Sequence, residues 1–254
     1  MAAKHALLLL VFLLFFQGCT AKERTLSVFA ASSLREAFQD IAEEFEAQHG
    51  VKVEMNFAGS NTLRVQIEQG ATADVFASAS EEHILALERK GYVEQAKPFA
   101  ENRLVLIVPA SNPAGIESVQ DLRGDVKLVI AGEAVPAGRY AREALRSLDS
   151  VYGRGFSQEV LSRVVSNEDS VRGVLAKVAL GEADAGIVYA TDALAADGKV
   201  KVVELPPEAE VEPRYYVGVL ANAENREAAE AFVDFLLSRR GRQILRSHGF
   251  EVVE

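Results

Sequence analysis

The chain has 254 residues, of which 49% are hydrophobic, 7% aromatic and 25% charged. This length and apolar content allow a sizeable core in one large domain or two lobes, and they exclude a disordered chain. The formal net charge of −10 argues against a nucleic-acid-binding protein, which normally carries a basic patch. The single cysteine excludes an internal disulfide and any metal site that needs two or more cysteines.

The first nineteen residues have the pattern of an export signal. Lys4 and His5 precede an unbroken apolar run over residues 6–16, which is shorter than the roughly 20 residues needed to span a bilayer. Gly18 and Cys19 follow this run and resemble the lipobox of bacterial lipoproteins, in which the cysteine carries a lipid. We therefore expect residues 1–18 to be a signal peptide of an exported chain, with lipidation of Cys19 or, alternatively, plain secretion.

The remaining chain alternates between strand-like and helix-like segments. Leu34, Phe38, Ile41 and Phe45 recur at the spacing of one helix face, and Gly50 is placed to end that helix. Strands separated by helices are typical of α/β proteins, and we expect the sheets to be mainly parallel. The predicted strands are 26–30, 51–57, 75–77, 104–108, 128–130, 185–189, 200–203 and 215–220. The predicted helices are 34–49, 63–69, 81–90, 139–148, 170–180, 223–237 and 239–248.

The signatures of common enzyme classes are missing from the sequence. No G-x-S-x-G motif marks a nucleophilic serine, and residues 132–139 lack both the glycine spacing and the lysine of a phosphate-binding loop. Residues 153–155 lack the third glycine of a dinucleotide fingerprint. The four histidines are far apart and show no metal-ligand spacing. We therefore expect a binding protein with no cofactor and no directly bound metal ion.

Small polar turns precede four of the predicted helices. They span residues 31–34, 58–61, 135–138 and 168–171. A helix N-terminus exposes unpaired N–H groups and the positive end of the helix dipole, so several of them at one cleft would bind an anion without cationic side chains. Taken singly, each turn is better explained by helix capping. Ser33 with Glu36 fits a capping box, and Ser60 and Asp169 are placed to cap their own helices.

Six short motifs carry a resemblance to a known family, and they run in order from about Thr25 to Phe250. They are VFAASSL at 28–34, FAGSNTL at 57–63, ADVF at 73–76, VPAGRYA at 135–141, DSVRG at 169–173 and GIVY at 186–189. Their order and spacing resemble the periplasmic molybdate-binding proteins of ABC transporters. The resemblance covers nearly the whole mature chain.

The resemblance implies the two-lobed type II fold of periplasmic solute-binding proteins, an α/β architecture with a ligand cleft between lobes that a hinge joins. Lobe 1 would comprise residues 25–103 plus 215–254, and lobe 2, residues 104–214, would be inserted into it. The family's cycle is closure of the lobes on the anion, followed by delivery to the membrane permease of an ABC importer. The resemblance thus implies a monomer that is periplasmic, or held by a lipid on Cys19 at the outer face of the cytoplasmic membrane.

Carrying the family's ligand site over residue by residue gives five positions. Ser33 and Ser60 would each donate a hydroxyl and a backbone N–H from lobe 1. Ala137 and Val171 would contribute backbone N–H groups from lobe 2, and Tyr189 would add its phenol. Molybdate or tungstate would be the transported ligand, and the sequence does not rank the two.

The neighbours of these five positions qualify the assignment. Ser32 precedes Ser33 directly, and the motif match makes Ser32 the second choice of the pair, with a packed turn as its structural role. Glu168 and Asp169 lie close to Val171 and put negative charge near the expected anion. A shell made only of donors would reject monohydrogen phosphate, because its proton needs an acceptor.

Two other functions stay open at this point. Another oxyanion, such as sulfate or phosphate, would use the same fold with a different cavity size and balance of donors and acceptors. An exported serine hydrolase would use Ser33 or Ser60 as its nucleophile. That reaction needs a base, and no motif places His49, His83 or His248 beside either serine.

Overall fold

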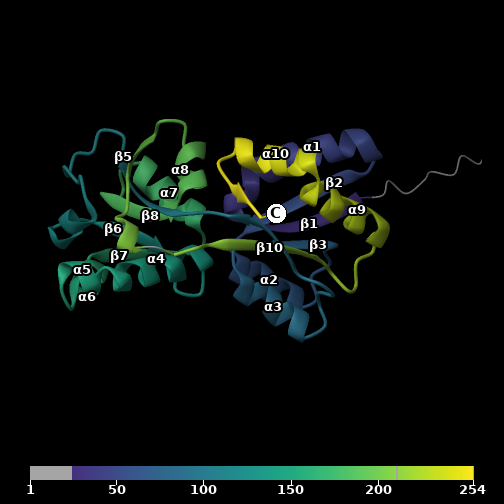
Figure 1. Cartoon of the computed structure of the whole chain (residues 1–254), viewed down its shortest axis with the longest axis horizontal. Helices are drawn as coiled ribbons and strands as arrows, with labels where there is room; N and C mark the ends of the chain where they lie inside the picture. The colour runs from purple at the N-terminus through teal and green to yellow at the C-terminus, as the bar shows by residue number, and fades with distance from the viewer. Residues whose placement is uncertain (1–24, 210, 254) are drawn as a thin grey trace, which may run out of the picture.

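The computed structural model describes residues 25–209 and 211–253, and their strands form two separate sheets (Figure 1). Sheet 1 has six strands in the order β11-β4-β10-β3-β1-β2, and sheet 2 has five in the order β7-β6-β8-β5-β9. The strands are β1 (Thr25–Ala31), β2 (Lys52–Ala58), β3 (Val75–Ser78), β4 (Lys97–Glu101), β5 (Leu104–Pro109), β6 (Leu128–Ala131), β7 (Val164–Glu168), β8 (Ala185–Tyr189), β9 (Val200–Val203), β10 (Arg214–Val219) and β11 (Glu251–Val252).

Helices cover both faces of each sheet. In sheet 1, α1, α9 and α10 lie on one face and α2 and α3 on the other, while α7 and α4 lie on opposite faces of sheet 2 (Figure 1). The helices are α1 (Arg35–His49), α2 (Ser60–Glu68), α3 (Glu81–Arg89), α4 (Pro136–Ser147), α5 (Asp149–Tyr152), α6 (Phe156–Leu161), α7 (Val171–Ala179), α8 (Ala190–Ala195), α9 (Arg226–Leu237) and α10 (Arg239–Ser247). Three short 3-10 helices are η1 (Ser32–Leu34), η2 (Val119–Arg123) and η3 (Pro207–Ala209).

Helix α1 shows how the sequence pattern becomes packing. Phe38, Ile41 and Phe45 are fully buried, and the rings of Phe38 and Phe45 meet Phe232 of α9 edge-on at 6.1 and 5.3 Å between centroids. Gly50 ends the helix with φ of +64°, a conformation that favours glycine. The predicted helix and its glycine end are therefore confirmed.

The expectation of mainly parallel sheets is wrong. The pairs β1-β2, β1-β3, β6-β7 and β6-β8 are parallel, whereas β3-β10, β4-β10, β4-β11, β5-β8 and β5-β9 are antiparallel. β5 and β10 are the first strands after the two points at which the chain passes from one sheet to the other. Each enters its new sheet antiparallel to the strands beside it, which is why the sheets are mixed. The prediction also missed β4, β7 and β11, which are short or carry exposed polar residues.

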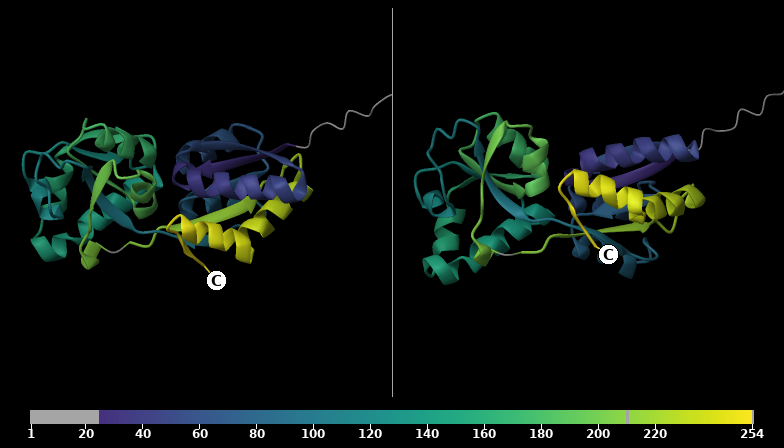
Figure 2. Two further views of the ribbon diagram at one scale, coloured as in Figure 1. Left: turned by 90° about the horizontal axis from the view of Figure 1, so that it is seen from above. Right: turned by 45° about the horizontal axis from the view of Figure 1, so that its top comes forward.

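Two α/β bodies lie side by side, one on each sheet (Figures 1 and 2). The chain leaves sheet 1 between β4 and β5 and returns between β9 and β10. We propose that these bodies are the lobes expected from the sequence, lobe 1 with residues 25–103 plus 215–254 and lobe 2 with residues 104–214. The expected signal peptide, residues 1–18, and Cys19 lie outside the described residues. Within the described part of the chain, no helix has the length and apolar character needed to cross a membrane.

Candidate functional site

The parallel strands of both sheets end at one small cavity between the lobes. In lobe 1, β1, β2 and β3 end beside it, and in lobe 2, β6, β7 and β8 do. The carboxyl ends of parallel strands share one edge of a sheet, so the turns that follow them gather there. Twelve uncharged residues line the cavity: Ala31, Ser32, Ser33, Ala58, Gly59, Ser60, Ala79, Val135, Pro136, Ala137, Val171 and Tyr189.

All five residues expected at the ligand site line this cavity, and so does Ser32. The cavity is narrow, with a volume of about 10 Å³, close to the smallest space that holds one water molecule. Pockets for organic ligands are typically about 300–1,000 Å³. The cavity therefore suits a small ligand rather than an organic molecule of many atoms.

Ser60 is the first residue of α2, and a backbone hydrogen bond fixes its hydroxyl oxygen. Its Oγ accepts a hydrogen bond of 3.0 Å from the Ala79 backbone N–H, so its own proton is left to donate. Gly59, not Ser60, occupies the capping position of α2. The capping role predicted for Ser60 is therefore wrong.

Ser33 lies in η1, the short turn between β1 and α1, and is also buried. Its Oγ lies 2.9 Å from the hydroxyl of Tyr215, which stands at the start of β10. The capping box predicted for Ser33 and Glu36 is wrong, since neither η1 nor α1 has a side-chain cap. Glu36 instead forms an ion pair with Arg172 of lobe 2.

In lobe 2, Ala137 is the second residue of α4, and its N–H belongs to the first turn of that helix. The preceding proline has no N–H and fixes φ at a helical value, which fits the first helical position. Gly138 lets the turn pack against β6, because a Cβ there would lie 2.2 Å from the carbonyl oxygens of Ala131 and Gly132. Close packing by Gly138 thus fixes where the Ala137 N–H points.

The second residue of lobe 2 that is expected to donate a backbone N–H is Val171, the first residue of α7. Ser170 caps this helix by accepting a hydrogen bond of 3.4 Å from the Gly173 N–H, so the capping role predicted for Asp169 is wrong. The Glu168 carboxylate pairs with Lys177 at 2.7 Å. Burial alone would raise the pKa of Glu168, but the bonds from Lys177 and Ser166 outweigh it and lower that pKa. Lys177 therefore neutralises the charge of Glu168 beside the cavity.

Tyr189 ends β8 and presents a buried hydroxyl at the cavity. Within the described residues, this oxygen has no hydrogen-bond partner. Burial raises the pKa of Tyr189 well above its usual value, so the phenol keeps its proton and stays a donor. An unpaired buried hydroxyl is costly in a folded protein, so a ligand in this cavity would gain a hydrogen bond from it.

An ion pair joins the two lobes beside the cavity. Arg172 of α7 pairs with Glu36 of α1 and also lies 2.9 Å from the Asp192 carboxylate of α8. Asp192 is fully buried, and burial outweighs the attraction of Arg172 and raises its pKa to about 7. On the other side of the cavity, the His83 ring nitrogen Nε2 lies 3.1 Å from the carbonyl oxygen of Ala134. Lobe 1 and lobe 2 therefore touch on both sides of the cavity.

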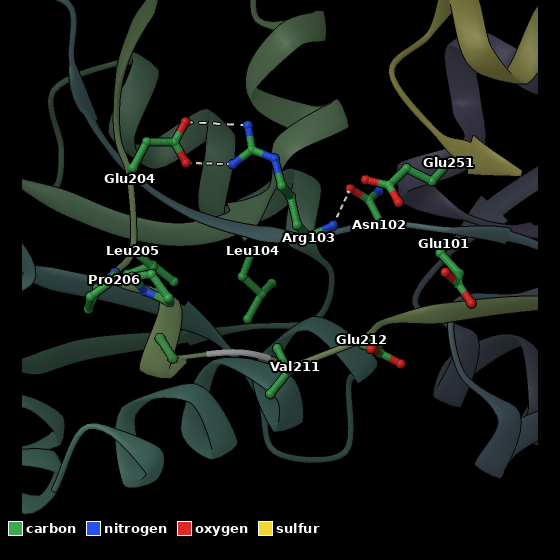
Figure 3. Close-up of a pocket in the computed structure, with 12 residues that line it drawn as sticks. Glu101, Asn102, Arg103, Leu104, Glu204, Leu205, Pro206, Val211, Glu212 and Glu251 are labelled. Atoms are coloured by element: carbon green, nitrogen blue, oxygen red, sulfur yellow. Dashed lines mark hydrogen bonds and ion pairs between the residues drawn. The ribbon is translucent and has the colours of Figure 1, made fainter. Parts of the chain in front are cut away.

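Larger hollows exist, and Figure 3 shows one of about 430 Å³ beside the two segments where the chain changes sheets. Its walls carry Glu101, Glu204, Glu212 and Glu251, and Arg103 pairs with Glu204 at 2.5 Å (Figure 3). Acidic walls do not suit an anion. Among the described residues, no group of three or more His, Cys, Asp or Glu side chains could hold a metal ion.

Sequence reasoning missed two residues behind the site, Tyr215 and Asn102. Tyr215 contacts Ser33 across 182 positions of sequence, and Asn102 contacts Tyr215 across 113. Both lie where the chain changes sheets, outside every motif that carried the resemblance. No local pattern in the sequence marks them.

Comparisons with known proteins agree on the type of protein. Residues 26–251 match the family model for bacterial extracellular solute-binding proteins. The chain is 39% identical to the molybdate-binding protein ModA of Mycobacterium tuberculosis, covering 92% of this chain and 87% of that protein. It is 32% identical to a putative ABC transporter substrate-binding lipoprotein, YvgL, of Bacillus subtilis, covering 90% and 87%. The solved substrate-binding domain of a putative molybdenum ABC transporter from Clostridium difficile is similar with a TM-score of 0.67 and 34% identity, covering 91% and 99%.

Proposed function

The chain belongs to the bacterial extracellular solute-binding proteins, and from this premise we propose that it captures molybdate, and tungstate as well, in the cavity between its lobes. The observation that carries the proposal is the buried Tyr189 hydroxyl, which lacks a partner in the described chain and opens on a cavity with uncharged walls. A tetrahedral dianion would supply the missing acceptor.

We propose that five residues hold the anion. Ser33 and Ser60 donate hydroxyl protons from lobe 1, Ala137 and Val171 donate backbone N–H groups from lobe 2, and Tyr189 donates its phenol. Hydrogen bonds to a charged acceptor are each worth about 1.5–3 kcal/mol net, and micromolar affinity needs about −8 kcal/mol in total. Neutral donors are therefore sufficient, even after the cost of desolvating the dianion.

The same donors explain which anions the site would refuse. Molybdate and tungstate carry no proton at neutral pH, whereas monohydrogen phosphate brings one that needs an acceptor. A cavity that offers only donors leaves that proton unpaired, at the cost of a buried unsatisfied polar group. Sulfate also lacks a proton, so cavity size must separate it from molybdate.

We propose transport without a chemical step. The nucleophile of a hydrolase needs a base within hydrogen-bond reach, and in the described chain each histidine has another neighbour. His49 stacks on Phe45, His83 faces the Ala134 carbonyl, and His248 pairs with Asp40. Ser33 and Ser60 instead contact Tyr215 and the Ala79 N–H. The loaded protein then delivers its anion to the permease of an ABC importer as a monomer without a cofactor.

We propose that the mature protein works outside the cytoplasm, with a lipid on Cys19 as its anchor. The family is extracellular, and a relative of 32% identity is described as a lipoprotein. Mass spectrometry of the membrane-extracted protein tests the anchor. A mature N-terminus at Cys19 with a lipid mass supports it, and a free thiol on a soluble mature chain contradicts it.

A thermal-shift titration of residues 25–254 with molybdate, tungstate, sulfate and phosphate tests the cargo. A ligand that binds only the folded state adds about 2.7 kcal/mol at 100 times its dissociation constant, which is a readily measured shift. We expect a shift with molybdate and tungstate alone. A shift with sulfate or phosphate would change the cargo, and no shift with any oxyanion would contradict the function.

A further inference from the structure

We propose that Asn102 and Tyr215 form a hydrogen-bond relay that forces Ser33 to act as a donor toward the cavity, and that this relay makes the site select oxyanions without a proton. The inference rests on the proposed function and assigns two specificity-determining residues behind the site. Neither residue lines the cavity. They are positioning residues that act through Ser33.

The relay begins at Asn102, whose amide has only one orientation that satisfies its neighbours. Its Oδ1 accepts a hydrogen bond of 2.9 Å from the Arg103 backbone N–H, a group that can only donate (Figure 3). The Nδ2 group must therefore face the other way. It donates to Thr191 Oγ1 at 2.9 Å and to the Tyr215 hydroxyl at 3.4 Å.

The second step is the hydrogen bond that the Tyr215 hydroxyl donates with its single proton. Tyr215 is fully buried, and its ring packs edge-on against Phe99, Tyr189 and Phe250. Burial raises the pKa of Tyr215, so the phenol keeps its proton. Among the described residues the oxygen has two hydrogen-bond partners, Asn102 and Ser33, and the Asn102 Nδ2 group can only donate. The buried proton therefore has Ser33 Oγ, 2.9 Å away, as its acceptor.

The last step fixes the role of Ser33. Its Oγ accepts from Tyr215, and a hydroxyl has one proton, so that proton points away from Tyr215 and into the cavity. Ser60 is held in the same way, because its Oγ accepts from the Ala79 N–H. Both serines of lobe 1 thus turn a proton, not a lone pair, toward the anion. The chain behind Ser33 spans both lobes, since Thr191 belongs to α8 of lobe 2.

The direction of the relay can be reversed by one substitution. In Asn102→Asp, the carboxylate accepts from Tyr215, the Tyr215 oxygen then accepts from Ser33, and Ser33 presents a lone pair to the cavity. The Arg103 N–H still donates to the new carboxylate, and the Thr191 hydroxyl, which accepts from Asn102 in the wild type, can turn to donate to it. In Tyr215→Phe the relay is cut, and the Ser33 lone pair is freed without being forced inward.

The experiment is isothermal titration at pH 8 of the wild type, Asn102→Asp, Tyr215→Phe and Tyr216→Phe with molybdate and with inorganic phosphate. Tyr216 is the matched control, a neighbouring buried tyrosine that packs in a separate apolar cluster with Phe29 and Phe76. We expect molybdate affinity to fall about a hundredfold in Asn102→Asp and about tenfold in Tyr215→Phe, the range that one charge-assisted hydrogen bond carries. Phosphate binding should rise into the measurable range in Asn102→Asp, and Tyr216→Phe should keep both affinities within twofold.

The outcomes separate the relay from the function. Loss of molybdate affinity with a gain for phosphate supports the relay. Loss of molybdate affinity without any gain for phosphate, or no change in either variant, overturns the relay while wild-type molybdate binding keeps the proposed function. A wild type that binds no molybdate overturns both.

Discussion

The two lobes meet the same cavity with different kinds of donor. Lobe 1 places two side-chain hydroxyls at the cavity: the Ser60 oxygen accepts from the Ala79 N–H, and the Ser33 oxygen lies 2.9 Å from the Tyr215 hydroxyl. Lobe 2 brings Ala137 and Val171 to the cavity at two helix starts, with the backbone N–H groups proposed as donors, and one side chain, Tyr189. The chemistry of lobe 1 therefore depends on residue identity, whereas that of lobe 2 depends mostly on where its helices begin.

The contrast extends to one buried carboxylate in each lobe. In lobe 1, the Asp74 carboxylate accepts from the backbone N–H groups of Ser27 and Asn225 at 2.8 and 3.0 Å. In lobe 2, Asp192 faces Arg172, which reaches across to Glu36 of lobe 1. Lobe 2 thus holds a titratable group in the contact between the lobes, and lobe 1 holds its buried carboxylate with fixed backbone dipoles.

The largest expected effect concerns this lobe 2 carboxylate and pH. Its pKa is about 7 in the fold and near 3.8 when exposed, so the folded state binds more protons between these values. The free energy of unfolding should therefore fall as pH rises from about 4 to 7, by up to about 1.4 kcal/mol per pH unit. Asp192→Asn should flatten this slope in thermal unfolding from pH 4.5 to 8. Asp197→Asn, at an exposed site, is the control and should keep the slope; an equal slope in Asp192→Asn would contradict the assignment.

The next effect tests whether the lobes must meet closely. Gly59 of lobe 1 approaches lobe 2 so nearly that a Cβ would lie 2.6 Å from the Asp169 carbonyl oxygen. Gly59→Ala should therefore hold the lobes apart and lower molybdate affinity about a hundredfold, or about 2.7 kcal/mol. A Cβ would also lie 2.6 Å from Oδ1 of Asn61, a side chain of lobe 1 that can rotate away. Since the backbone clash lies between the lobes, the melting temperature of the ligand-free protein should change little. Titration calorimetry checks the affinity, and Gly132→Ala, whose Cβ would keep 3.7 Å from its nearest neighbour, is the control.

Ser60→Ala tests the side-chain dependence of lobe 1. It removes one donor and leaves the Ala79 N–H buried without its partner. We expect molybdate affinity to fall tenfold to hundredfold and the free energy of unfolding to fall by about 1–3 kcal/mol. Ser118→Ala, which disturbs a capping box in lobe 2 away from the cavity, should lose stability but not affinity. Full affinity in Ser60→Ala would remove Ser60 from the site.

Tyr189→Phe tests the one side-chain donor of lobe 2 and should act in the opposite way on stability. The lost hydroxyl has no partner in the described chain, so its removal should leave the ligand-free protein equally stable or slightly more stable. Molybdate affinity should fall about tenfold, as for one lost hydrogen bond. Paired melting and titration experiments check this, with Tyr152→Phe as the control. Lower stability of the ligand-free variant would mean that the hydroxyl has a structural role.

Local periodicity was enough to predict most helices and strands. Phe38, Ile41 and Phe45, for example, recur at the spacing of one helix face, and all three are buried. The strand directions were not predictable in the same way. Whether β10 enters sheet 1 parallel or antiparallel depends on the route of the chain through lobe 2, which no window of sequence contains.

The site shows the same division between local and distant information. Local residues predicted helix starts at 139 and 170, and the structure begins these helices at Pro136 and Val171. The resemblance to family motifs placed Ala137 and Val171 with the two serines and Tyr189, and all five line the cavity. The predicted capping by Glu36 is wrong because the Glu36 carboxylate pairs with Arg172, which lies 136 positions away in the sequence. Tyr215 and Asn102 were missed because only the fold brings them behind Ser33.

The smallest expected effect is the change of molybdate affinity with salt concentration. Its sign distinguishes a site made of neutral dipoles from one made of charged side chains. The cavity walls carry no charged residue, while the whole chain carries a formal charge of −10. Added salt should therefore screen only a weak long-range repulsion between protein and dianion, because the Debye length falls from about 10 Å at 0.1 M to about 3 Å at 1 M. Molybdate affinity should rise, by less than about threefold, between 0.05 and 0.5 M sodium chloride, with sodium nitrate as the control for competition by chloride. A basic patch would give a steep fall instead, and such a fall would show that cationic side chains, not the hydroxyls of lobe 1 and the helix starts of lobe 2, hold the anion.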